Sequence, residues 1–175
     1  RKILNTADEI NLSVLCRFLK KEKLNRPTKT VDRRSFESPF PNDMWQSDVM
    51  HGPHVIVDGK LKKSYLIAIL DDHSRMIIHG EFYLSESLAT FKACLKVAIS
   101  KRGLPQKLYI DNGSCYRALN LEQITALLGI GISHTPPYTP QGRGKIEKWF
   151  RYVRESFLVT SRDITSLEKL NEAFN

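Results

Sequence analysis

The stretch SYLIAILDDHSRMIIHGEFYL, residues 64–84, holds two apolar runs separated by a polar connection. Residues 64–70 are continuously apolar, which is typical of a strand buried on both faces. Residues 75–84 mix apolar and polar side chains and predict a second strand. Asp71 and Asp72 lie between them and are interpreted as a hairpin connection. The stretch therefore predicts two adjacent strands at the centre of a sheet.

The residues before this stretch extend the same sheet. Residues 44–50 predict a short strand, and the pair Asp58-Gly59 between that strand and residue 64 is a strong signal for a tight hairpin turn. The first three strands are therefore expected to form an antiparallel meander.

After residue 84 the hydrophobic pattern changes from strand to helix. Residues 85–102 carry apolar side chains at helical spacing and are followed by Gly103, which suits a helix end. The remaining segments predict a strand, a helix, a strand, a long helix and the start of another helix; they are residues 107–110, 121–128, 130–134, 144–158 and 165 onward. The fold class predicted is α/β, a mixed five-stranded sheet flanked by helices.

Two further segments precede this core, which is expected to span residues 44–175. Residues 1–24 are expected to be a helical segment, because residues 6–24 place apolar side chains on one face. They form either the end of a helix-turn-helix DNA-binding module or an ordinary amphipathic surface helix. Residues 25–43 contain three prolines and no periodicity, and are interpreted as a linker. Because the chain begins with Arg, it is interpreted as part of a longer protein.

The charge is concentrated in two places. The chain has a net charge of +8; residues 1–34 hold ten Lys and Arg against four Asp and Glu, and residues 141–154 hold five against one. This distribution favours a polyanionic partner, although a solvated face would have the same composition. No apolar run is long enough for a membrane span. The three cysteines suggest no disulfide framework, so a cytoplasmic location is expected, and the five scattered histidines do not suit zinc.

Three acidic residues stand at element ends. Asp48 lies near the end of the first strand, Asp111 follows residues 107–110, and Glu147 lies in the first turns of the long helix. Three carboxylates brought together repel unless a cation neutralises them, and oxygen ligands of this kind suit Mg²⁺ or Mn²⁺, with two ions able to serve a phosphodiester. Each acid also has a structural interpretation: a strand-end acceptor, an Asp-Asn-Gly turn, or a surface pair with Arg151.

Three motifs, in this order, resemble a known family: WQSDVMHGP from residue 45, YIDNGSCY from residue 109 and HTPPYTPQGRGKIEKWFRYVR from residue 134. They are similar to the integrase-core (DDE) domain of bacterial transposases and retroviral integrases. The resemblance implies an RNase H-like fold, with Asp48, Asp111 and Glu147 as the metal-binding and catalytic triad. The chain lacks the His/His/Cys/Cys zinc module of retroviral integrases. The residues after Asn112-Gly113 also depart from the acidic or aromatic pair common in relatives.

The resemblance implies a DNA transposase that cleaves transposon ends and transfers the 3′-hydroxyl to target DNA, acting as a homo-oligomer on double-stranded DNA. The alternatives are a catalytically silent DNA-binding relative and a nuclease that cuts without joining. Along the third motif, Trp149 and Tyr152 could stack on DNA bases or pack against the protein, and packing is the favoured interpretation. The expected DNA contacts are Tyr138, Gln141, Arg143, Lys145, Lys148, Arg151 and Arg154.

Overall fold

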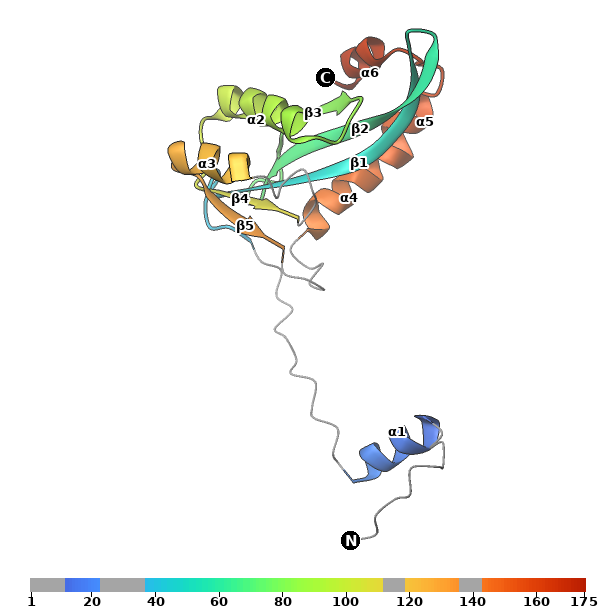
Figure 1. Ribbon diagram of the computed structural model, residues 1–175, viewed down its shortest axis with the longest axis vertical. Helices are drawn as coiled ribbons and strands as arrows, with labels where there is room; N and C mark the ends of the chain where they lie inside the picture. The colour runs from blue at the N-terminus through green and yellow to red at the C-terminus, as the bar shows by residue number, and fades with distance from the viewer. Residues whose placement is uncertain (1–11, 23–36, 112–118, 136–142) are drawn as a thin grey trace. The chain divides into compact units, whose positions relative to one another are not determined.

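The computed structural model describes residues 12–22, 37–111, 119–135 and 143–175, drawn in colour in Figure 1. The chain divides into two compact units, Arg1–Arg34 and Ser35–Asn175. In the first unit, helix α1 (Leu12–Lys21) lies within the helix expected over residues 6–24. Its apolar side chains Val14, Leu15 and Phe18 are exposed. Among the described residues, no helix is long and apolar enough to cross a membrane.

A mixed five-stranded sheet forms the centre of the second unit, as the sequence predicted. The strands lie in the order β3-β2-β1-β4-β5. They span Met44–Val57 (β1), Lys60–Asp71 (β2), Ile77–Tyr83 (β3), Lys107–Ile110 (β4) and Gly131–His134 (β5). The first three strands pair in an antiparallel meander, and β4 and β5 continue the sheet in parallel with β1.

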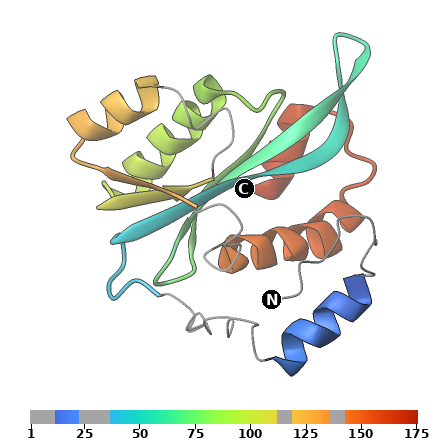
Figure 2. The ribbon, with the colours of Figure 1, turned by 60° about the horizontal axis from the view of Figure 1, so that its bottom comes forward.

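The β1–β2 hairpin is longer than the sequence predicted. It continues to a two-residue turn at Asp58 and Gly59, whose φ angles of 53° and 71° are both positive, as a type I′ turn requires. Strand β4 pairs with β1 only from Met44 to Gln46. The far end of the hairpin therefore extends past the other strands (Figure 2). Its residues are mostly exposed, which explains why an apolar pattern did not reveal it.

Helices cover both faces of the sheet (Figures 1 and 2). Helices α2 (Leu88–Arg102) and α3 (Leu119–Leu127) lie on one face, where Trp45, Phe91 and Leu121 belong to one buried cluster. Ser87 begins α2 with a capping box, and Gly103 ends it at a φ of 80°. The last helical region covers the other face.

That last region is one continuous helical stretch with a change of winding. It comprises α4 (Gly144–Tyr152), the π-helical turn η2 (Val153–Phe157) and α5 (Leu158–Thr160), and is followed by α6 (Leu167–Phe174). Ile146, Phe150 and Val153 are buried against the sheet and recur at helical spacing. The region corresponds to the long helix expected over residues 144–158.

The end of the expected linker belongs to the second unit. The backbone N–H of Ser38 donates to the Asp72 carboxylate at 2.7 Å, and that of Asn42 donates to Asp71 at 2.8 Å. The Asn42 side chain also accepts a hydrogen bond from Trp45 at 2.9 Å. Residues 37–43 are therefore fastened to the core, and the division between the units falls after Arg34 rather than after residue 43.

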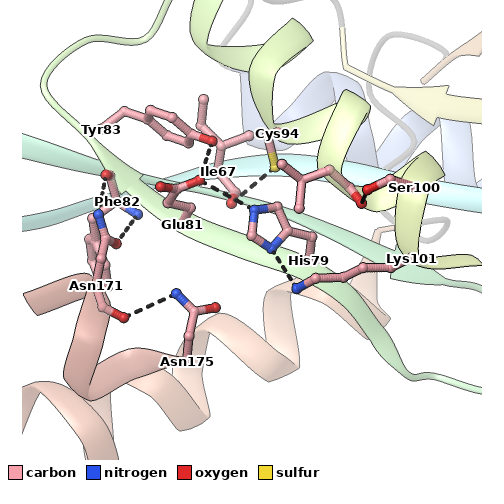
Figure 3. A network of polar contacts seen from close by, with 11 residues as sticks. Ile67, His79, Glu81, Phe82, Tyr83, Cys94, Ser100, Lys101, Asn171 and Asn175 are labelled. Atoms are coloured by element: carbon pink, nitrogen blue, oxygen red, sulfur yellow. Dashed lines mark hydrogen bonds and ion pairs between the residues drawn. The ribbon is translucent and has the colours of Figure 1, made fainter.

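Polar side chains fasten the outer strand β3 to its neighbours (Figure 3). The side-chain amide of Asn171, on α6, donates to the Phe82 carbonyl at 2.9 Å and accepts from the Phe82 N–H at 2.7 Å. Within β3 itself, Glu81 accepts hydrogen bonds from Tyr83 at 2.7 Å and from His79 at 3.3 Å. The Asn171 contacts cover part of an edge that would otherwise be open to another strand.

A candidate acidic site where two parallel strands separate

The pairing of β1 with β4 brings two of the expected acids opposite each other. Met44 pairs with Lys107 and Gln46 with Tyr109, so that each residue of β1 faces the residue 63 positions later. Continued by two residues, this register sets Asp48 against Asp111. Both acids follow the last residues that pair β1 with β4, where the two parallel strands separate. Asp111 follows β4 directly, whereas Asp48 lies inside β1, which continues to Val57, and not near a strand end as the sequence predicted. The sheet itself therefore brings together two acids that the sequence separates widely.

The carboxylates of Asp48 and Asp111, which we call the acid pair, share the positively charged side chain of Arg143. The guanidinium of Arg143 forms an ion pair with Asp48 and a second one with Asp111, at 3.4 Å. The three side chains are 19% (Arg143), 15% (Asp48) and 31% (Asp111) exposed. Arg143 stands at the N-cap of α4, and its own side chain makes no capping hydrogen bond. The arginine thus neutralises part of the negative charge of the acid pair.

Burial and charge act in opposite directions on the pKa values of this group. Burial raises the pKa of the Asp48 carboxyl above its ordinary value, against the lowering effects of Arg143 and of the Val49 backbone N–H. Burial lowers the pKa of Arg143, but the charges of Asp48, Asp111 and Glu147 outweigh it, and that pKa is raised. The arginine therefore stays charged, and the negative charges of all three expected acids help to keep it protonated.

Glu147 approaches the acid pair from the helix. It lies one turn after Arg143, and its backbone N–H donates to the Arg143 carbonyl at 3.1 Å. Glu147 and Asp48 line one cavity of about 430 Å³, together with Phe150 and Arg154. One acid from the sheet and one acid from the helix therefore line the same cavity.

The donor atoms suit a hard divalent cation. Carboxylate oxygens are the ligands that Mg²⁺ and Mn²⁺ prefer, and a guanidinium already occupies a cationic position between two of them. As the side chains stand, no three His, Cys, Asp or Glu residues within the described ranges are grouped closely enough to hold a metal ion. The carboxylates of Asp48, Asp111 and Glu147 have the ligand chemistry that such an ion prefers.

Comparison with known proteins identifies the family. Residues 39–140, more than half of the chain, match the family model of the integrase core domain. This chain belongs to that family. The matched range contains Asp48 and Asp111 and ends before Glu147, whose place in the site rests on its position in α4.

Relatives of the integrase core are found in a transposon and in retroviruses. The chain is 32% identical over 139 residues to the transposase for transposon Tn552 of Staphylococcus aureus, a match covering 70% of this chain and 28% of that protein. It is 30% identical over 118 residues to the Gag-Pro-Pol polyprotein of sheep pulmonary adenomatosis virus, covering 67% and 6%. The chain therefore spans less than a third of the length of these relatives.

Solved structures show the same fold. The magnesium complex of the HTLV-2 integrase catalytic core domain, in its dimeric form, aligns with a TM-score of 0.59 at 21% identity, covering 77% of this chain and 85% of that one. A chain of the simian T-cell lymphotropic virus intasome aligns with a TM-score of 0.65 at 20% identity, covering 79% and 49%. The RNase H-like fold expected from the sequence motifs is therefore confirmed.

The residues expected to contact DNA divide into three groups in this integrase core. Lys148, Arg151 and Arg154 are exposed along the last helical region. Arg143 and Lys145 are engaged inside the protein, the latter through its amino group, which contacts the Asp72 carboxylate and backbone carbonyl, each at 2.8 Å. Tyr138 and Gln141 lie outside the described residues.

Two side chains of the third motif differ in their surroundings. Trp149 packs against Phe150 and Phe174, in agreement with the expectation that it belongs to the core. Tyr152 is 66% exposed, so the expectation that it packs is wrong. The reason is the helical spacing: Tyr152 lies off the stripe formed by Phe150 and Val153, and it borders an open cavity beside Trp149 and Gly80.

Sequence reasoning missed the central role of Asp72. This residue is completely buried, and its carboxylate accepts hydrogen bonds from the Gln46 side chain at 2.6 Å and the Ser38 backbone, besides its ion pair with Lys145. The pair Asp71-Asp72 indicated only a connection between strands. A fully buried acid with a cation at its side is a structural anchor that ties the start of α4 to the end of β2.

Proposed function

We propose that this chain is the catalytic core of a DDE-type transposase, which cleaves DNA at transposon ends and joins the freed 3′-hydroxyl to target DNA. The observation that carries the proposal is that Asp48 stands opposite Asp111 where β1 and β4 separate, and lines one cavity together with Glu147. Membership of the integrase core family and similarity to a transposase support it.

In this proposal Asp48, Asp111 and Glu147 hold two Mg²⁺ or Mn²⁺ ions. Bound there, the ions would activate an attacking hydroxyl and stabilise the leaving oxygen of a phosphodiester. The protein's part is to fix three carboxylates on rigid elements, one within a strand, one directly after a strand and one on a helix. The relative from HTLV-2 was solved in complex with magnesium, which agrees with this choice of ion.

The exposed basic residues of the last helical region would position the DNA. Lys148, Arg151 and Arg154 can contact backbone phosphates, and Arg154 lines the same cavity as Asp48 and Glu147. Such contacts orient the scissile phosphate without reading base sequence. Two DNA ends must be held together for joining, so the active form in this proposal is a homo-oligomer on double-stranded DNA.

The test is an assay that separates cutting from joining. The protein is incubated with labelled transposon-end DNA, target DNA and Mg²⁺ or Mn²⁺, and both 3′-end cleavage and strand transfer are scored. Asp48→Asn, Asp111→Asn and Glu147→Gln should each reduce both activities by more than about 100-fold, because each removes a metal ligand. Asp163→Asn, at an exposed acid away from the cavity, is the matched control and should retain activity.

Each other outcome assigns a different function. Cleavage without joining would support a nuclease on the same fold. DNA binding without cleavage would support a catalytically silent relative. Joining that survives Asp111→Asn would overturn the assignment of the triad.

A further inference from the structure

Arg143 and Lys145, near the start of α4, both form ion pairs with acids of the core, but the two sites differ. Lys145 reaches Asp72, whose carboxylate is also held by two further hydrogen-bond donors, Ser38 and Gln46. Arg143 reaches the acid pair, where its Nε atom is buried and has no hydrogen-bond partner among the described residues. A guanidinium that belonged permanently in this position would be expected to satisfy its buried donors. The contrast indicates a fixed pair at Asp72 and an exchangeable one at Asp48 and Asp111.

The position of Arg143 permits such an exchange. The residue stands at the N-cap of α4, so its side chain can turn without breaking the hydrogen bonds inside the helix. A divalent ion and the guanidinium exclude each other, because Mg²⁺ requires carboxylate oxygens at about 2.0–2.1 Å and would repel a neighbouring positive charge. Any ion bound by both acids must therefore displace this arginine.

We propose that Arg143 is an exchangeable cation that occupies the acid pair in the absence of metal, leaves it when a divalent ion binds, and then contacts a DNA phosphate. The last step rests on the proposed function, whereas the displacement depends only on the ion pairs described above. The arginine weakens metal binding, because the ion meets a site that is already neutralised. Metal and DNA then bind cooperatively, since the ion releases a side chain for the phosphate.

Metal titration tests the displacement. The affinity of the full chain for Mn²⁺ is measured by calorimetry in the absence of DNA, for the wild type, Arg143→Gln and Arg154→Gln. If Arg143 occupies the site about nine-tenths of the time, Arg143→Gln should bind Mn²⁺ about tenfold more tightly. Arg154→Gln removes an equal charge beside the same cavity and should change the affinity by less than about twofold.

Two results would overturn the displacement. One is an Arg143→Gln affinity equal to or weaker than that of the wild type. The other is an equal gain in Arg154→Gln, which would show a general effect of charge. Because the expected result is a gain in binding, a misfolded variant cannot imitate it. A double variant that adds Asp48→Asn should lose the gain, which locates the ion at the acid pair.

DNA binding tests the second half of the exchange. The affinity for end DNA is measured by fluorescence anisotropy with and without Ca²⁺. The wild type should gain more affinity from the ion than Arg143→Gln does, and an equal gain in both proteins would overturn the phosphate contact. If no cleavage or joining is found in any condition, the proposed function fails, while the Mn²⁺ titration still decides the displacement.

Discussion

The ion pair between Lys145, at the start of α4, and Asp72 should contribute to the stability of the fold. The Asp72 carboxylate is fully buried, while the Lys145 side chain that reaches it is 13% exposed. Asp72→Asn would keep a polar group for the Ser38 backbone but leave the lysine without its counter-charge. We expect a loss of about 3–5 kcal/mol in the free energy of unfolding, measured in urea. Asp163→Asn should stay within about 0.5 kcal/mol. Equal effects of the two variants would show that the buried pair contributes little.

His79 should give the stability of the protein a dependence on pH. Burial lowers the pKa of this imidazole below its ordinary value of 6.5, and the nearby Lys101 lowers it further, against the opposing effect of Glu81. The folded protein therefore binds fewer protons here than the unfolded chain. The stability due to the neutral ring is present above pH 6.5 and is lost as pH falls below it, by at most about 1.4 kcal/mol per pH unit.

Unfolding in urea at several values between pH 7 and pH 5 measures this slope. His79→Gln should flatten it, and His54→Gln, at an exposed ring, should leave it unchanged. A slope that persists in His79→Gln would place the titrating group elsewhere.

At the residue scale, motifs and element ends point to individual residues, whereas the contacts between their side chains depend on the fold. Asp48, Asp111 and Glu147 were chosen from motifs and element ends, and the fold brings the first two together through a parallel register. The partners of Arg143 and Lys145 were not foreseen. Lys145 and Asp72 lie 73 positions apart, and their contact depends on how α4 crosses the sheet. A local sequence pattern cannot predict a contact between residues that are so far apart along the chain.

At the scale of elements, the order of strands and helices was predictable because each hydrophobic period is local. The apolar run at residues 64–70 and the helical stripe of α2 both depend on burial, which the sequence displays directly. The length of the β1–β2 hairpin was not predictable, since its outer residues are exposed and carry no apolar alternation. The attachment of residues 37–43 was also missed, because it consists of hydrogen bonds from the backbone.

The contact between α6 and the edge of β3 should be important for stability. Asn171 makes two hydrogen bonds to the backbone of Phe82, replacing those that a neighbouring strand would make. Asn171→Ala leaves both backbone groups unpaired and should cost about 2–4 kcal/mol in the free energy of unfolding. Asn175→Ala, which removes an exposed hydrogen bond at the chain end, is the matched control and should cost less than about 0.5 kcal/mol. If Asn171→Ala behaves like the control, water replaces the lost contacts.

At the scale of the whole molecule, charge and fold are divided between two units. The unit Arg1–Arg34 carries six of the eight net positive charges, and Ser35–Asn175 contains the sheet and the acidic site. A compact unit with its own core should fold alone. We therefore expect residues 35–175 to unfold in one cooperative transition, with a melting temperature within about 2 °C of that of the full chain.

The same deletion should weaken DNA binding. Counterion release makes the logarithm of the affinity fall with the logarithm of salt concentration, by about 0.9 for each phosphate neutralised. Removing ten Lys and Arg side chains should therefore make this slope shallower by several units and reduce the affinity at low salt. Anisotropy titrations of both proteins between 50 and 200 mM salt, roughly the range over which such contacts are lost, measure the slope. An unchanged slope would show that the unit Arg1–Arg34 makes no contact with DNA phosphates. A lower melting temperature for residues 35–175 than for the full chain would show that the stability of the core depends on that unit.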